Sequence, residues 1–168
     1  MTITETDRLR LRVQTLEDAP FILALMADPD WVRYIGDRGV RDLEDARRYI
    51  ESGAVAQQRA HGVSLWVAES KATGAPLGIC GLVVRDGLEA PDLGFAFLPE
   101  HRGQGYASEA ARAALEVARD AGMERVLAVV TPDNGPSRTL LEDLGFEEIR
   151  IARQDGGPVL ILALESLR

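Results

Sequence analysis

The segment Phe97–Ala110, with the sequence FLPEHRGQGYASEA, combines residue types that suit the binding of an anion. It joins a predicted strand to a predicted helix, and Gly103 and Gly105 leave the backbone bare where the chain turns. Backbone N–H groups in such a turn can point outward at the positive end of the helix dipole, which suits a pyrophosphate. Arg102 would add positive charge to the same site.

Other interpretations of this turn stay open from the residues alone. Glycine-rich connections that bind no ligand are common between strands and helices. A dinucleotide-binding Rossmann fingerprint needs Gly or Ala at the position of Ser108, and it needs an acidic residue at the end of the next strand, where Val130 and Thr131 stand. A nucleoside-triphosphate loop is excluded, because no Gly-Lys-Ser/Thr follows the turn.

The apolar pattern predicts the elements that position this segment. Leu9, Leu11 and Val13 alternate with arginines as in a half-buried strand. Helices are expected over about Thr15–Ala27, Asp42–Gln58, Gly105–Ala121 and Pro136–Leu144, and strands over Val63–Glu69, Leu77–Val84, Asp92–Leu98, Val126–Thr131, Glu147–Ala152 and Val159–Leu164. This order predicts an α/β fold with a mixed sheet and packed helices, in one domain that spans residues 1–168.

Several motifs identify a family that this chain resembles over nearly its whole length. Arg102–Ala107 matches the Arg/Gln-x-x-Gly-x-Gly/Ala signature of the GCN5-related N-acetyltransferase (GNAT) superfamily, and Ser108–Ala110 looks like the start of that family's central helix. Thr131–Ser137, followed by Leu144–Phe146, resembles its second motif, Asn-x-x-Ser/Ala and then Gly-Phe. Asp7–Arg12 is similar to the RimJ/RimL branch, which acetylates the N-termini of ribosomal proteins. The predicted element order is also the family's order.

The resemblance implies a fold and a place for a cofactor. It implies a mostly antiparallel central sheet with about four flanking helices, in which two parallel strands, here Asp92–Leu98 and Val126–Thr131, splay apart around acetyl-CoA. Backbone groups on the first strand would bind the pantetheine arm, and the glycine-rich turn would hold the pyrophosphate. The cofactor-binding residues expected on this basis are Phe97, Leu98, Arg102, Gly103, Gln104, Gly105, Tyr106, Ala107, Asn134 and Ser137.

The resemblance also implies direct transfer of the acyl group to a neutral amine in a ternary complex. Many relatives deliver a proton to the leaving thiolate from a tyrosine seven residues after the motif asparagine, but Leu141 stands there in this chain. The RimJ/RimL branch has a serine where Ser137 stands, and we expect Ser137 to serve as the donor. An alternative is that Asn134 and Ser137 only shape the start of the short helix.

The general base is less clearly marked in the sequence. Asp92 opens a predicted strand and could face the cleft, and Glu69 ends another; both also fit ordinary solvated carboxylates at strand ends. At neutral pH an α-amine, with a pKa of ~7.7–8.0, is neutral far more often than a lysine amine, with a pKa of ~10.4. The lack of an obvious base therefore fits an enzyme that acts on α-amines.

The expected amine site lies in the irregular segment after the first predicted helix. Trp31, Tyr34 and Arg38, with Asp37 between them, stand in the region that borders the acceptor in this family. Irregular loops on a rigid scaffold often determine specificity. The alternative is that the two aromatic residues simply pack against the sheet.

Composition excludes several other classes of protein. The chain has 168 residues, of which 46% are hydrophobic and 27% charged, with a net charge of -8. Such a charge argues against a nucleic-acid partner, and no run approaches the ~20 apolar residues that cross a bilayer. No secretory signal is evident at the N-terminus, so a cytoplasmic location is expected. Cys80 is predicted to be a small buried hydrophobic residue, and the spacing of His61 and His101 indicates no metal site.

These observations predict an acyl-CoA-dependent N-acyltransferase. It would move acetyl from acetyl-CoA to a primary amine, either the N-terminus of a protein or a small molecule, as a monomer or a homodimer. One alternative is a non-catalytic, regulatory module that binds CoA, since Leu141 departs from the family's pattern. Another is a Rossmann-type nucleotide binder, which would bind NAD(P) and no CoA.

Overall fold

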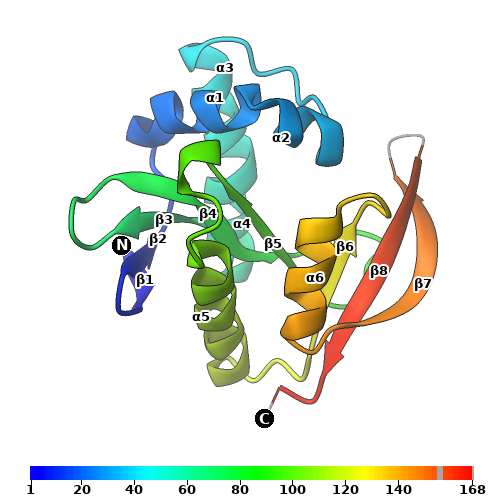
Figure 1. Cartoon of the computed structure of the whole chain (residues 1–168). Helices are drawn as coiled ribbons and strands as arrows, with labels where there is room; N and C mark the ends of the chain where they lie inside the picture. Colours follow the sequence, from blue (N-terminus) through cyan, green and yellow to red (C-terminus); the bar gives the residue numbers. More distant parts are fainter. Residues whose placement is uncertain (155–156, 168) are drawn as a thin grey trace.

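An eight-stranded sheet forms the centre of the molecule (Figure 1). The computed structural model describes residues 1–154 and 157–167. The strands lie in the order β1-β2-β3-β4-β5-β6-β8-β7, and neighbours are antiparallel except β5 and β6, which are parallel. Their bounds are β1 Thr2–Glu5, β2 Leu9–Arg12, β3 Leu65–Ser70, β4 Pro76–Val83, β5 Asp92–Phe97, β6 Arg125–Val130, β7 Glu147–Gln154 and β8 Gly157–Glu165.

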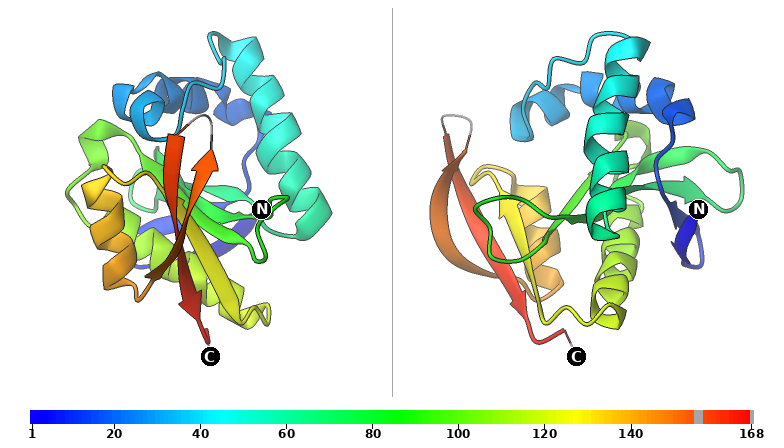
Figure 2. Two further views of the ribbon diagram at one scale, coloured as in Figure 1. Left: turned by 90° about the vertical axis from the view of Figure 1, so that its right-hand side faces the viewer. Right: turned by 180° about the vertical axis from the view of Figure 1, so that it is seen from behind.

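Helices cover both faces of this sheet. Figure 2 shows α3 and α4 on one face, and α5 lies on the opposite face in the same views. The α-helices are α1 Ala19–Ala27, α2 Pro29–Tyr34, α3 Leu43–Ile50, α4 Ala56–His61, α5 Tyr106–Asp120 and α6 Gly135–Asp143; short turns of 3-10 helix at Leu16–Asp18 and Pro99–His101 and of π-helix at Glu51–Val55 complete them. No helix among the described residues combines the length and apolar character needed to span a membrane.

Two apolar clusters fix the layers on the sheet. One joins α5 to the face of the sheet that presents Trp66 and Cys80, through alanines that allow a close approach. The other packs α1 and α3 against the opposite face at Val67 and Ile79. Cys80 is fully buried as expected, and burial raises the pKa of its thiol, so it stays an apolar packing group.

The predicted α/β class and mixed sheet are confirmed, but three local predictions are wrong. Thr2–Glu5 adds an edge strand that was not expected, and it pairs with β2. The segment after α1, expected to be irregular, contains α2, because Asp28 caps its first turn and Pro29 occupies a position without an N–H partner. The single helix expected over 42–58 is divided by the π-helical turn at Glu51–Val55 and continues to His61.

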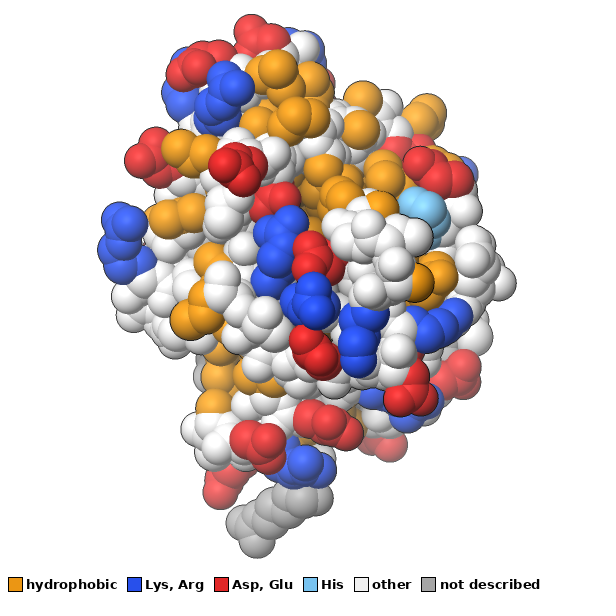
Figure 3. All heavy atoms as spheres, turned by 90° about the vertical axis from the view of Figure 1, so that its left-hand side faces the viewer, with side chains coloured by type: hydrophobic (Ala, Val, Ile, Leu, Met, Phe, Trp, Pro, Cys, Tyr) orange, Lys and Arg blue, Asp and Glu red, His pale blue; other side chains and the backbone are white. Residues whose placement is uncertain are grey.

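Ion pairs tie the N-terminal edge of the sheet together. Figure 3 faces the side that carries β1 and shows acidic and basic side chains interleaved across it. Arg10 pairs with Glu5 at 2.9 Å and with Glu69 at 3.0 Å, while Arg12 pairs with Glu69 at 2.7 Å and with Asp18 at 2.8 Å. Glu69 is thus a cross-strand partner of two arginines, which accounts for the alternating arginines of β2.

Gly81 in β4 marks the closest approach inside the sheet. A Cβ at this position would lie 1.9 Å from the carbonyl oxygen of Ser64, so the strand would have to move. We expect Gly81→Ala to lower the free energy of unfolding by at least about 3 kcal/mol, measured by urea denaturation. Gly53→Ala is the matched control: a Cβ there meets no atom within 4 Å, and alanine favours a helical backbone. Equal stability of both variants would contradict this packing.

Candidate functional site

The two parallel strands at the centre of the sheet part almost as soon as they meet. Among the described residues the ladder between β5 and β6 has one registered pair, Asp92 with Leu127, supported by a 2.8 Å hydrogen bond from Leu127 N–H to the Pro91 carbonyl. Beyond that point the strands diverge, so backbone groups that a parallel neighbour would normally satisfy face a gap.

The direction of the backbone N–H and C=O groups alternates along β5, and this alternation shows which of them face the gap. The N–H of Leu98 donates to the Leu77 carbonyl at 3.0 Å, toward β4, so the neighbouring odd-numbered residues of β5 turn their N–H and C=O toward β6. Phe95 therefore presents its N–H and C=O to the gap, and Phe97 presents its N–H, since the Phe97 carbonyl accepts from Nε of Arg102. The expectation for Leu98 needs correction, because its N–H is already bonded within the sheet and it does not line the cavity described next.

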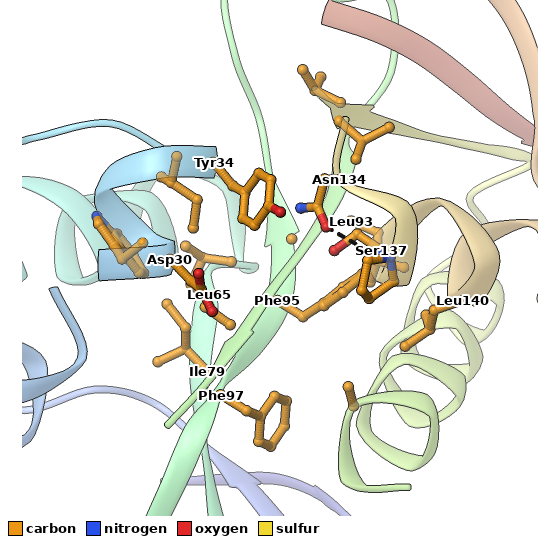
Figure 4. A pocket seen from close by; sticks show the side chains of 18 of the residues that line it. Asp30, Tyr34, Leu65, Ile79, Leu93, Phe95, Phe97, Asn134, Ser137 and Leu140 are labelled. Carbon is orange, nitrogen blue, oxygen red and sulfur yellow. Dashed lines mark hydrogen bonds between the residues drawn. The ribbon is translucent and has the colours of Figure 1, made fainter. Parts of the chain in front are cut away.

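A cavity of about 520 Å³ occupies the gap and extends to α2 on one side and α6 on the other (Figure 4). Its size is that of an ordinary small-molecule site. Of the residues singled out from the sequence, it brings together Trp31, Tyr34, Arg38, Asp92, Phe97, Arg102, Gly103, Gly105, Tyr106, Ala107, Asn134 and Ser137.

The glycine-rich turn lies at the N-terminus of α5, as predicted. Gly103 and Gly105 have φ angles of +73° and +83°, a conformation that other residues rarely adopt. Both line the cavity together with Tyr106, while Gln104 does not. The Gln104 side chain instead donates to the Glu100 carbonyl at 3.2 Å, so only the backbone of Gln104 contributes to the turn.

Arg102 lines the cavity, and carboxylates pair with its guanidinium. Its guanidinium bonds to the Asp30 carboxylate at 2.8 Å, to the Asp28 carboxylate and, through Nε, to the Phe97 carbonyl at 3.0 Å. Two carboxylates thus offset the charge that was expected to attract a pyrophosphate. Asp28 and Asp30 were not singled out from the sequence, because their distance of more than 70 residues from Arg102 left no local signal.

Asn134 and Ser137 lie side by side on the α6 wall of the cavity (Figure 4). The Asn134 side chain accepts from the Ser137 N–H at 3.3 Å and caps α6, as the alternative interpretation expected. The Ser137 hydroxyl has no hydrogen-bond partner in the part of the chain that the structure describes, so it can still act on a bound molecule. Leu141 is buried and lines the same wall.

Asp92 is the most deeply buried carboxylate among the described residues that line the cavity. It is only 1% exposed, and its Oδ1 lies 3.0 Å from Nε of Arg85. Burial raises the pKa of Asp92, and the charge and hydrogen bond of Arg85 oppose that rise without cancelling it. Arg85 was not singled out from the sequence. The signal that could have found it is the register of the β4–β5 hairpin, which places Val83, two residues before Arg85, opposite Asp92.

The structure separates Glu69 from this site. Burial raises the pKa of Glu69, but hydrogen bonds from Arg12 and Arg10 outweigh it and leave the pKa below its usual range. Glu69 does not line the cavity, and its two arginine partners hold it as a carboxylate. Its role as a base is therefore disfavoured by both position and partners.

The expected acceptor residues form the α2 side of the cavity. The Tyr34 hydroxyl points across the gap toward Asn134 (Figure 4). Trp31 is 6% exposed and packs in the apolar cluster under α1, and its indole N–H has no partner within the described residues. Arg38 donates to the Ile35 carbonyl at 3.3 Å. Asp37 lies outside the cavity and pairs with Arg41 at 2.5 Å. Lining residues that the sequence did not indicate include Tyr49, His101, Gln154 and Val159.

Comparison with known proteins now gives the family. The model of the acetyltransferase (GNAT) domain matches residues 8–147. This chain belongs to the GNAT family of acetyltransferases. The expected enzyme class is thereby confirmed, together with the fold.

The similar proteins include two from Bacillus subtilis (strain 168). "Uncharacterized protein YkkB" is 32% identical over 165 residues, 96% of this chain and 94% of that protein, and "Uncharacterized N-acetyltransferase YoaA" is 32% identical over 154 residues, 90% and 86%. A solved RimL, a ribosomal L7/L12 alpha-N-protein acetyltransferase in complex with coenzyme A, superposes with a TM-score of 0.82 at 17% identity, over 99% of this chain and 98% of that one. At that identity the likeness establishes the fold.

The buried Asp92 predicts a specific dependence of stability on pH. Because its folded-state pKa is raised, folding favours the protonated carboxyl. That contribution is fully present below the ordinary pKa of 3.8 and is lost as pH rises through the raised value. The free energy of unfolding of Asp92→Asn, relative to the native chain, should therefore increase as pH rises above about 4.

The measurement is urea denaturation of both proteins from acidic to neutral pH. Asp120→Asn, at a side chain that is 75% exposed, serves as the control and should vary far less. If the difference in the free energy of unfolding between Asp92→Asn and the native chain stays constant or decreases with rising pH, burial does not control the pKa of this carboxyl.

Proposed function

We propose that this chain is an acyl-CoA-dependent N-acyltransferase that moves acetyl from acetyl-CoA to a primary amine in a ternary complex. The observation that carries the proposal is one cavity that joins the glycine-rich N-terminus of α5 to the gap between β5 and β6. RimL, whose fold is similar, is described with coenzyme A bound. We further propose that residues 1–168 form a single N-acetyltransferase domain and act in the cytoplasm.

The cavity offers each part of acetyl-CoA a matching partner. Backbone N–H groups at Gly103 and Gly105, at the positive end of α5, suit the pyrophosphate. The N–H and C=O of Phe95 and the N–H of Phe97 suit the amide groups of pantetheine, which pair like a neighbouring strand. The Thr131 hydroxyl is buried without a partner in the described chain and lines the same cavity, so a polar ligand group would satisfy it.

The proposed reaction makes a C–N bond and breaks the thioester C–S bond. The neutral amine attacks the thioester carbonyl, and a backbone N–H of β5 stabilises the negative charge that develops on its oxygen. The amine proton passes to the Asp92 carboxylate, directly or through water, since a raised pKa makes it a stronger base. The Ser137 hydroxyl donates a proton to the departing thiolate and regains one from solvent.

The acceptor side favours an α-amine, such as the N-terminus of a peptide. Among the described residues lining the cavity, Asp92 is the most deeply buried carboxylate, and Arg85 restrains its basicity. An α-amine is already partly neutral at pH 7, so it needs less help from a base than a lysine does. Trp31 and Tyr34 would border the acceptor, with Arg38 at the edge of the cavity. A small-molecule α-amine meets the same chemical requirement.

The first test of the proposal is cofactor binding. We expect CoA and acetyl-CoA, but not NADPH, to raise the melting temperature, because a ligand that binds only the folded state stabilises it by ~2.7 kcal/mol at a hundredfold excess over Kd. Gly103→Asp should abolish this shift, since its carboxylate would repel the pyrophosphate. Gly122→Asp is the matched control, with φ of +83° and open space around it, but outside the cavity.

The outcome separates the proposal from its alternatives. Stabilisation by NADPH alone would favour a Rossmann-type binder. The absence of any CoA response in the native chain would overturn the proposal. A CoA response without turnover of any amine would favour a regulatory module that binds CoA, for which Leu141 in place of the family's tyrosine already provides some support.

Kinetics test the assignment of the base. Asp92→Asn should lower kcat/KM for the amine by about 10²–10⁴-fold while CoA still binds. Arg85→Gln removes the interaction that holds the Asp92 pKa down, so the acidic limb of the pH profile of kcat/KM should move to higher pH. An acidic limb that stays in place in Arg85→Gln would exclude Asp92 as the titrating base.

Kinetics also test the proton donor. Ser137→Ala should lower kcat with little change in the Kd of CoA, and thioesters with a more acidic thiol as leaving group should lose less rate, because they need protonation less. Ser137→Thr keeps the hydroxyl and should retain more activity. Full activity in Ser137→Ala would leave Ser137 only as part of the start of α6.

A further inference from the structure

The turn between β1 and β2 is tied to the start of α5, about 100 residues further along the chain. The Thr6 hydroxyl and the Arg8 N–H both donate to Oε1 of Glu109, at 3.0 and 3.2 Å. Nε of Arg8 donates to Oε2 of the same carboxylate at 2.7 Å. Neither Arg8 nor Glu109 lines the cavity, so this contact lies outside the proposed pyrophosphate site.

The Arg8 guanidinium reaches the glycine-rich turn itself. Nη1 donates to the Gln104 carbonyl at 2.9 Å, and the guanidinium carbon stacks 4.3 Å above the centre of the Tyr106 ring. A Cβ on Gly105 would lie 3.3 Å from Nη2. One arginine therefore contacts three successive residues of the turn from its outer side.

The contact with Gln104 determines where the next N–H points. The described chain has no cis peptide bond, and in a trans peptide the C=O of one residue and the N–H of the next point in opposite directions. Since Arg8 holds the Gln104 carbonyl on the outer side, the Gly105 N–H points away from Arg8. Gly105 lines the cavity, so that direction is the one in which a bound anion would lie.

Arg8 also neutralises an acidic side chain close to the proposed pyrophosphate site. Glu109 is the acidic residue of the first turn of α5, near the proposed pyrophosphate. An uncompensated carboxylate there would repel an incoming anion and weaken the attraction of the helix dipole. The pair with Arg8 and the bond from Thr6 neutralise it.

We propose that Arg8 is a positioning residue for the pyrophosphate of acyl-CoA: it fixes the outer side of the glycine-rich turn, directs the Gly105 N–H into the cavity and neutralises Glu109, without touching the ligand. The inference rests on the proposed function, since it needs CoA to bind at this turn. It assigns a role to the N-terminal Asp7–Arg12 motif, which the reaction itself does not use.

The test compares a ligand that has the pyrophosphate with one that lacks it. We expect Arg8→Gln to raise the Kd of CoA about tenfold, by calorimetry, and to leave the Kd of S-acetylpantetheine, followed by NMR titration, within about twofold. Arg10→Gln, two residues further along the chain but paired with Glu5 and Glu69, is the matched control and should change neither Kd.

The outcomes are distinguishable. If the native chain binds no CoA, the proposed function fails. If it binds CoA and Arg8→Gln binds equally well, or loses both ligands equally, only the role of Arg8 is overturned. Should Arg8→Gln fail to fold, Arg8→Lys is the deciding variant. Its ammonium keeps the positive charge beside Glu109 but lacks the guanidinium fork that reaches Gln104. Its affinity for CoA should therefore fall by less than tenfold, and its affinity for S-acetylpantetheine should not change.

Discussion

The parting of β5 from β6 is the constraint on which the rest of the molecule depends. A central parallel pair normally satisfies its backbone groups within the sheet, but here the ladder has one registered pair among the described residues. The divergence leaves the N–H and C=O of Phe95 and the N–H of Phe97 facing a cavity. Unpaired amide groups inside a sheet are costly unless a ligand or water satisfies them. The fold at this point therefore suits a ligand that forms hydrogen bonds as a neighbouring strand would.

The glycine-rich turn is held between two arginines on opposite sides. Arg102 joins it to Asp28 and Asp30 at the start of α2, the element that borders the proposed amine site. Arg8 joins it to the turn between β1 and β2 from outside the cavity. A turn with two glycines would be pliable on its own. These ion pairs connect the proposed cofactor turn to the N-terminal third of the chain, where the acceptor residues lie.

Local patterns predicted the parts of the site that depend on local chemistry. The turn at Gly103 and Gly105, and the cap that Asn134 forms on α6, follow from residue types and spacing. The failures are non-local. Leu98 was chosen without the register that turns its N–H toward β4. The carboxylate partners of Arg102 were missed because they lie far away in sequence. The first helix was expected to end at about Ala27, and the Asp28-Pro29 pair that follows begins another helix.

Hydrogen exchange at the backbone amides of β5 tests the central claim most directly. In the free protein the Phe95 and Phe97 N–H groups face the gap, whereas the Leu98 N–H bonds to Leu77. Saturation with CoA should slow exchange strongly at Phe95, Phe97 and the glycine-rich turn, and should leave the β7–β8 pair unchanged. Unaltered exchange at Phe95 and Phe97 with CoA bound would contradict the account and move the cofactor to another part of the molecule.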